Sequence, residues 1–308
     1  MNYTTPMKDR TYWKNYVHQA NADEIVRSIK LGSFFSEGEN LELVYFENSK
    51  NTPNVLIAPG SGAHAYVYAE LGYFIYLKGY NVFILPKHGS DHTIEGLMKR
   101  CADAALHISS HFNSRVGLVG GGLGGFAAFY LALAGGPMKS IVCEDSPGIL
   151  TEKKFQEAIT EGGGMAKRRK LLLPLLKVLV KIFPKVKMPL SLYLNWKEVI
   201  DTKEENRKLE TYLVEKYEAD PDFDKWYTLS SVMSLVSTHP PYPLTELKIP
   251  TMFLVPIRGF APAYVKDLYN RLPTVKKKLV EVDGGIFYFE SHPRDAAKII
   301  CEWFAETL

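Results

Sequence analysis

Short apolar runs alternate with segments of helical periodicity over most of the chain. Runs rich in β-branched and aromatic residues predict strands, and apolar residues at three- and four-residue spacing predict helices. The expected strands are residues 41–46, 54–59, 81–85, 116–119, 140–143, 251–255 and 278–282, and the expected helices are residues 66–77, 93–112, 126–134, 262–272 and 293–306. This alternation predicts an α/β fold with a mostly parallel sheet covered by helices on both faces. Ligands in such folds bind beyond the carboxyl ends of the strands.

The alternation is interrupted over residues 148–244. This segment has a helical pattern, is rich in lysine and leucine, and contains Pro174, Pro184 and Pro189. An insertion above the carboxyl edge of the sheet would cover a site beneath it. We therefore expect a helical cap, or lid, at 148–244 on a core domain made of residues 1–147 and 245–308. The polar residues before 41 are expected to be helical.

Composition narrows the class of protein. Among 308 residues, 46% are hydrophobic and 23% are charged, which is typical of a soluble globular protein. The three cysteines are far apart and lack the spacing of a zinc site, which favours a reduced, cytoplasmic setting. No apolar run approaches the roughly 18 residues of a membrane helix. We expect no metal, no cofactor and no nucleic-acid partner.

Positive charge is concentrated in the expected cap. Residues 162–197 contain nine lysines or arginines and no acid, although the net charge of the chain is only +3. Within them, residues 167–183 place Lys170, Lys177 and Lys181 around a broad apolar stripe. Such a helix either touches an anionic membrane surface or an acyl chain, or packs its apolar face on the core with a solvated basic face. The second interpretation ranks first, because cap helices must pack somewhere.

A glycine-rich turn follows the strand at 116–119. The order of strand, tight turn and helix fits a nucleophile elbow, G-x-S-x-G, over residues 120–124, which read G-G-G-L-G. The nucleophile position is then Gly122. Residues 120–125 also match the dinucleotide motif G-x-G-x-x-G, which normally follows the first strand and has an acid about 20 positions on. The turn follows the fourth expected strand, so this interpretation ranks lower, as does a purely structural turn.

From about residue 41 to its end, the chain resembles the monoacylglycerol lipase and lysophospholipase-like branch of the α/β hydrolases. The matching segments are 58–62 (A-P-G-S-G) at the H-G-x-G oxyanion loop, 87–90 (K-H-G-S) at the R-G-H-G-x-S loop, 120–125 at G-x-S-x-G-G, 248–251 (K-I-P-T) before the acid's strand, and 282–286 (V-D-G-G-I) at G-G-H or G-x-x-H. The resemblance implies an α/β-hydrolase fold and the ancestry of a serine carboxylic-ester hydrolase.

The same resemblance places the catalytic triad at residues that cannot perform its chemistry. The nucleophile position is Gly122, the acid position is Gly259 and the histidine position is Ile286. Without a nucleophile the acyl-enzyme route is closed. The oxyanion hole of this family consists of backbone N–H groups, here those of Ser61 and Leu123, which need no serine side chain. A carboxylate, ester or other anion is therefore still an expected ligand.

Other polar residues in loops at the same edge are candidates for the pocket. Asp145 follows the strand after the elbow, where some relatives carry their acid, and His292 reads as the cap of the final helix. The remaining candidates are His64, His88, Asp91 and His92. A lone loop histidine is more often a solvent-exposed or structural group than a catalytic base.

Three functions remain open, in this order. The chain descends from an esterase or lipase and is inactive through a natural or engineered loss of the triad. Alternatively, it is a receptor-like binder of acyl or other apolar small molecules. In a third hypothesis, His88, Asp91 or His92 supports a different acid–base chemistry. The expected partner is a small apolar or acyl ester-like ligand, with at most weak membrane-surface contact through the basic cap.

Overall fold

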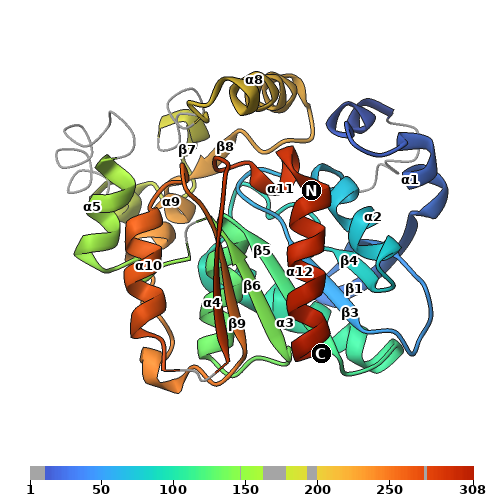
Figure 1. Ribbon diagram of the computed structural model, residues 1–308. Coiled ribbons are helices and arrows are strands. Elements are labelled where there is room, and N and C mark those ends of the chain that lie inside the picture. Colours follow the sequence, from blue (N-terminus) through green and yellow to red (C-terminus); the bar gives the residue numbers. More distant parts are fainter. Residues whose placement is uncertain (1–10, 146, 162–177, 193–199, 274–275) are drawn as a thin grey trace.

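The computed structural model describes residues 11–145, 147–161, 178–192, 200–273 and 276–308. Eight strands of these residues form one sheet in the order β1-β2-β4-β3-β5-β6-β9-β10 (Figure 1). Their bounds are β1 Lys30–Ser36, β2 Glu39–Phe46, β3 Asn54–Ala58, β4 Asn81–Ile84, β5 Val116–Gly121, β6 Ser140–Glu144, β9 Thr251–Pro256 and β10 Lys277–Val282. Strand β2 runs antiparallel to β1 and β4, and the other pairs are parallel. The expected mostly parallel sheet is confirmed.

Helices cover both faces of this sheet. The helices of the core segments are α1 Ala22–Ser28, α2 Ala69–Leu77, α3 Ile94–His111, α4 Leu123–Leu133, α10 Pro262–Arg271, α11 Tyr288–Ser291 and α12 Pro293–Thr307, with 3₁₀ helices η2 Thr11–Tyr16, η3 Ala65–Tyr68 and η5 Leu244–Glu246. Successive strand residues point to opposite faces. Val55 and Ile57 thus join the core cluster of α2 and α12, whereas Leu56 joins that of α3, α4 and α10.

The lead-in before residue 41 differs from the expectation. It contains η2 and α1, but residues 30–36 form the edge strand β1 instead of a helix. Only Phe34 and Ser36 of β1 are buried, so the strand has no apolar alternation that would have revealed it. Its antiparallel register with β2 supplies the backbone hydrogen bonds that a polar segment needs.

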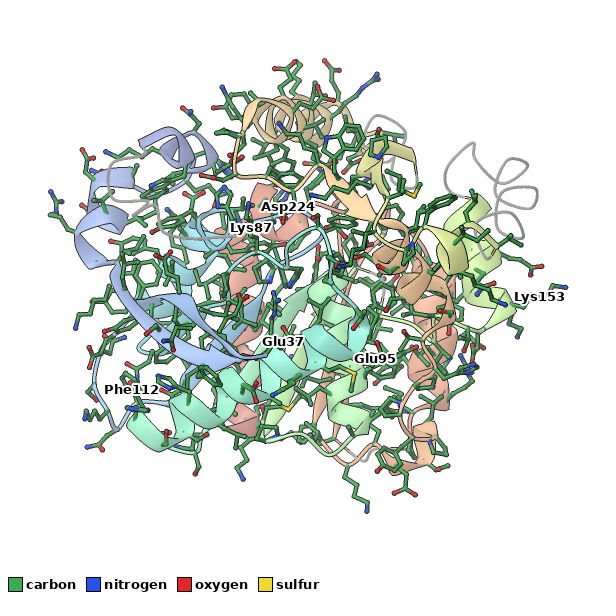
Figure 2. The ribbon with its side chains drawn as sticks, turned by 180° about the vertical axis from the view of Figure 1, so that it is seen from behind. Glu37, Lys87, Glu95, Phe112, Lys153 and Asp224 are labelled. Atoms are coloured by element: carbon green, nitrogen blue, oxygen red, sulfur yellow. The ribbon has the colours of Figure 1, made fainter. Side chains whose placement is uncertain are left out.

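The segment between β6 and β9 contributes α5 Lys153–Glu161, β7 Lys187–Pro189, η4 Leu190–Leu192, α8 Glu204–Ala219, β8 Trp226–Thr228 and α9 Leu229–Ser237. Strands β7 and β8 form a small antiparallel sheet that the sequence did not predict, because each has only three residues. Helix α8 and this sheet lie at the top of the main sheet in Figure 1. Lys87 joins the two parts by donating to Asp222 O and Asp224 Oδ1. Lys87 and Asp224 are labelled in Figure 2.

The basic stretch at 167–183 lies for the most part outside the described residues, so its expected packing is not tested. None of the described helices is both long enough and apolar enough to cross a membrane.

Candidate functional site

The turn between β5 and α4 has the geometry of a nucleophile elbow. Gly122 takes φ 48° and ψ −112°, a conformation that L side chains rarely adopt. A Cβ at Gly120 would overlap Gly124 O, and a Cβ at Gly124 would overlap Ala58 O, so both positions require glycine. A Cβ at Gly122 would meet no atom within 4 Å. The backbone thus holds open the space that a side chain at residue 122 would enter.

The turn's place in the sheet disfavours the dinucleotide interpretation. It follows the fifth strand along the chain, whereas the dinucleotide loop normally follows the first strand of its βαβ unit. It also lies beside the loop after β3, because Gly124 packs against Ala58.

A small cavity of about 70 Å³ lies at this turn. Three of its lining residues, Gly122, Ser61 and Ile286, were expected at the site from the sequence, and Asp145 was a further candidate. The remaining lining residues are Gly60, Ala63, Tyr68, Glu144, Tyr217, Phe223, Phe260, Phe287 and Glu290. Residues that are far apart in the sequence therefore converge at the carboxyl edge, from the core loops and from α8.

Gly259, the expected acid position, is not among the lining residues, but it lies beside Asp145, which is one of them. The Asp145 carboxylate is buried, and its Oδ1 accepts a hydrogen bond of 3.0 Å from the Phe260 N–H. A Cβ at Gly259 would overlap that same oxygen. Asp145 also has a positive φ of 65°, which aspartate tolerates better than most residues. A carboxylate from the end of β6 therefore occupies the space beside residue 259.

Two glutamates that the sequence did not single out also line the cavity. Glu144 is 2% exposed, and burial raises the pKa of its carboxyl well above the usual range. Burial also raises the pKa of Glu290 to about 7. The Tyr68 hydroxyl accepts from the Gly60 N–H at 2.9 Å and donates to the Glu290 carboxyl. The only hint in the sequence was the acidic pair that ends the apolar run of β6.

The expected oxyanion residues lie at the same edge. Ser61 lines the cavity, and Leu123 is the first residue of α4. The first N–H groups of a helix have no acceptor within that helix, and its N-terminus favours negative charge. Helix α4 therefore begins next to Gly122, which lines the cavity together with three acidic side chains, whereas Leu123 itself is not among the lining residues.

The loop histidine His64 is held in a structural contact outside the cavity. Its Nε2 lies 2.8 Å from Asp220 Oδ2, and its Nδ1 accepts from the Tyr66 N–H. The Tyr16 hydroxyl donates to the same Asp220 oxygen. Although burial opposes the charge, the hydrogen bond with His64 keeps the pKa of Asp220 lowered. Nε2 of His64 therefore joins the core to the end of α8, whereas Nδ1 caps η3.

The other loop candidates also lie outside the lining of the cavity. His88 Nε2 is bonded to Pro59 O, and burial lowers its pKa to about 3. His92 Nδ1 is bonded to Gly89 O, and burial lowers the pKa of His92. Asp91 accepts from the Thr228 hydroxyl. His292 contacts Ser291 Oγ at 2.8 Å and stacks on a tyrosine ring. Each side chain is committed to its own loop or to a neighbouring one.

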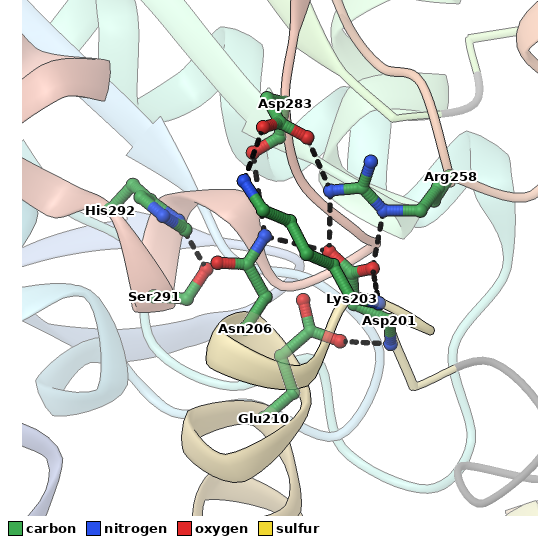
Figure 3. A network of polar contacts seen from close by, with 8 residues as sticks. All are labelled: Asp201, Lys203, Asn206, Glu210, Arg258, Asp283, Ser291 and His292. Atoms are coloured by element: carbon green, nitrogen blue, oxygen red, sulfur yellow. Dashed lines mark hydrogen bonds and ion pairs between the residues drawn. The ribbon is translucent and has the colours of Figure 1, made fainter.

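A polar network fixes the loops at residues 259 and 286 to α8 (Figure 3). Arg258 Nη2 donates to Asp201 Oδ2 at 2.9 Å and to Asp283 Oδ1 at 2.6 Å. Glu210 accepts from the Asp201 N–H at 2.7 Å and also from the Gly285 N–H. Lys203 and Asn206 complete the network. Four of its members lie within residues 201–210, but Arg258 and Asp283 come from distant segments, so the network has no local signal in the sequence.

Neighbouring charges and burial shift the pKa values of the acids in this network. Hydrogen bonds from Lys203 and Arg258 lower the pKa of Asp283 to about 2. Burial raises the pKa of Glu210 to about 7. The arginine therefore stabilises ionised aspartates, while the buried glutamate favours its neutral form.

Comparisons with known proteins agree with this geometry. No family model matches the sequence, and no curated protein matches it. Among solved structures, the chain is similar to the monoacylglycerol lipase of Paleococcus ferrophilus, with TM-score 0.67, 18% identity, and 87% of this chain and 99% of that chain covered. A soluble variant of monoglyceride lipase from Saccharomyces cerevisiae, in complex with a substrate analog, gives TM-score 0.66, 14% identity, and coverage of 91% and 95%.

The esterase Pf2001 of Pyrococcus furiosus gives TM-score 0.57, 11% identity, and coverage of 94% of this chain and 97% of that chain. Sheet order, helices and these similarities together define the class: the protein has the α/β-hydrolase fold. The fold expected from the sequence is thereby confirmed.

Proposed function

We propose that the chain descends from a serine esterase, has lost acyl-enzyme chemistry, and keeps its cavity as a binding site for a small molecule. The observation that carries this proposal is Gly122, which has the backbone conformation of an elbow and lines the cavity without a side chain. An acyl-enzyme needs a nucleophile at that point. The buried Ile286 offers no proton acceptor at the position assigned to the histidine.

The segment 148–244 acts in this proposal as the lid of the site. Tyr217 from α8 and Phe223 from the loop after it line the cavity. The polar network around Arg258 joins α8 to the loops that carry residues 259 and 286. A ligand held below α8 would therefore be enclosed by both the core and the lid.

Chemistry by the loop histidines has less support. His88 and His92 are buried, hydrogen-bonded to backbone carbonyls and outside the cavity lining. Neutral imidazoles without access to the cavity have no substrate atom within reach.

The test is restoration of the triad at two positions. We expect the wild type to resist a fluorophosphonate probe and to hydrolyse p-nitrophenyl acetate no faster than a protein without an active site. The variant Gly122→Ser/Ile286→His should be labelled at the introduced serine and should hydrolyse the ester about 100-fold faster or more, since general base catalysis alone contributes about that factor.

The matched control is Gly135→Ser, which places a serine at another glycine with positive φ and open space around its Cβ, in the turn after α4. It should give no labelling. Ester turnover by the wild type at the level of the restored variant would overturn the proposal. A folded double variant that is never labelled would contradict the assignment of the nucleophile position to Gly122.

A further inference from the structure

The cavity is acidic, although a lipase-like site would be expected to bind an ester or an anion. Glu144, Asp145 and Glu290 line it, and no lysine, arginine or histidine is among its lining residues. We infer that it binds a small organic ammonium ion, whose N–H groups meet the carboxyl groups while its alkyl part lies against the aromatic side chains. This inference rests on the proposed role of the cavity as a binding site.

Glu144 supplies the observation that points to a ligand. Its side chain lines the cavity and is almost fully buried, yet its Oε1 has no hydrogen-bond partner among the described residues. Buried polar atoms are nearly always paired, because an unpaired acceptor forfeits its hydration. A donor that enters the cavity would satisfy this oxygen, and an ammonium group would also offset the three neighbouring acids.

Aromatic rings from the core and the lid form the other wall. The rings of Tyr217 and Phe223 stack at 4.8 Å, and that of Phe287 lies 5.6 Å from Tyr217. Phe260 and Tyr68 complete the aromatic part of the lining. The faces of such rings attract alkylammonium groups through their quadrupoles. A carboxylate ligand would gain nothing from them and would be repelled by the acids.

Size and geometry restrict the cation further. A cavity of about 70 Å³ is smaller than the roughly 150 Å³ apolar cavity that holds benzene. It therefore suits an amine of only a few heavy atoms. Among the described residues, no group of three acidic, histidine or cysteine side chains converges closely enough to hold a metal ion.

Binding should strengthen as the pH rises. The groups around the Glu290 carboxyl are Tyr68 from η3, Glu144 at the end of β6, Asp145 directly after it, and Glu210 and Tyr217 from α8. An alkylammonium ion keeps its charge between pH 6 and pH 8. A carboxyl with a pKa of about 7 becomes mostly ionised over that interval, so affinity should rise about tenfold.

The experiment is calorimetric titration of the full chain at pH 8 with ethylammonium chloride, ethanol, sodium acetate and potassium chloride. We expect ethylammonium to bind at least about tenfold more tightly than the other three, which is the strength of one charge-assisted hydrogen bond. Glu144→Gln and Glu290→Gln should each weaken it about tenfold. The matched control, Glu302→Gln on the exposed side of α12, should leave it unchanged. The partly buried Glu290 provides the test if Glu144→Gln does not fold.

Equal binding of ethanol, tighter binding of acetate, or an equal response to potassium chloride would overturn the inference. If acetate or ethanol bound in a manner that depends on Glu144, the ligand class would be wrong while the proposed binding function stood. If the wild type instead hydrolysed esters at the level of the restored variant, the proposed function itself would fail.

Discussion

The two glycines assigned to the nucleophile and acid positions differ in what surrounds them. At Gly122 a Cβ would meet nothing within 4 Å, and the elbow conformation remains. At Gly259 a Cβ would overlap the carboxylate of Asp145, which is itself bonded to the next N–H in the chain. One position is open space, whereas the other is filled by an acid from a different strand.

This difference changes the meaning of the missing aspartate. Under the proposed assignment, the site lacks a nucleophile and a histidine, but it still carries a carboxylate next to the acid position. Asp145 and Ile286 line the same cavity. We predict that an introduced histidine at 286 pairs with Asp145, and that an aspartate added at 259 competes with Asp145 for space and charge.

The largest expected effect concerns Asp145 in the restored background. In Gly122→Ser/Ile286→His, the further change Asp145→Asn should remove most of the roughly 100-fold gain in kcat/KM, because an amide cannot stabilise the imidazolium. The asparagine keeps an oxygen that can accept from the Phe260 N–H, which limits structural damage. Steady-state hydrolysis of p-nitrophenyl acetate measures the effect.

The comparison variant for this experiment adds Gly259→Asp to the restored background instead. It should not raise activity, since the new carboxylate would occupy the space of Asp145. If Gly259→Asp raised kcat/KM and Asp145→Asn left it unchanged, the acid of the restored triad would belong at residue 259. The proposed role of Asp145 would then be wrong.

A smaller effect is expected when each glycine receives a single methyl group. Gly259→Ala should destabilise the protein by about 2–3 kcal/mol through crowding of Asp145 and Pro256 O. Gly122→Ala should cost about 1–2 kcal/mol from backbone strain alone. Denaturant unfolding measures both. Adding Asp145→Ala should recover about 1 kcal/mol for Gly259→Ala and nothing for Gly122→Ala, because only contacting residues couple. If Asp145→Ala recovered the same stability in both alanine variants, the two glycines would not differ in their contact with Asp145.

The sequence predicted the architecture well because apolar periodicity reports burial directly. It also brought Gly122, Ser61 and Ile286 to one edge of the sheet, where the structure places them around one cavity. It missed β1, whose residues are mostly exposed, and it could not reveal that Asp145 lies against Gly259, a contact across 114 positions. Side-chain packing of this kind depends on the three-dimensional approach of loops and leaves no periodic pattern.

The loop histidines, which the sequence offered only as pocket candidates, lie outside the cavity lining, and the buried glutamates were not singled out. His64 and His88 lie close to the elbow's edge, but their ring nitrogens are bonded to Asp220 and to a backbone carbonyl. Glu210 looks like an ordinary polar residue of an exposed helix, yet it is fully buried. The sequence alone does not show whether a charged side chain is solvated by water or hydrogen-bonded to backbone N–H groups.

The smallest expected effect concerns the ionisation of Glu210, close to the loop that carries the assigned acid position, Gly259. Glu210 supports the loop before Ile286 by accepting from the N–H of Gly285, and it faces Asp201 and Arg258, with Glu144 and Glu290 of the cavity nearby. Its pKa is about 7 in the folded protein, where burial raises it, and near 4.5 in the unfolded chain. The folded state therefore binds more protons between these two pKa values, and the stabilising contribution of protonated Glu210 is lost as the pH rises through 7.

Glu210→Gln keeps an acceptor oxygen and cannot ionise, so its stability relative to wild type should increase by on the order of 1 kcal/mol from pH 5 to pH 8. Urea unfolding at both pH values measures the change, with the exposed Glu302→Gln as control. If the stability difference between Glu210→Gln and wild type were the same at both pH values, Glu210 would be ionised throughout, stabilised by Arg258 and the backbone N–H groups. The surroundings of Gly259 would then carry a full negative charge, whereas the turn that contains Gly122 carries none.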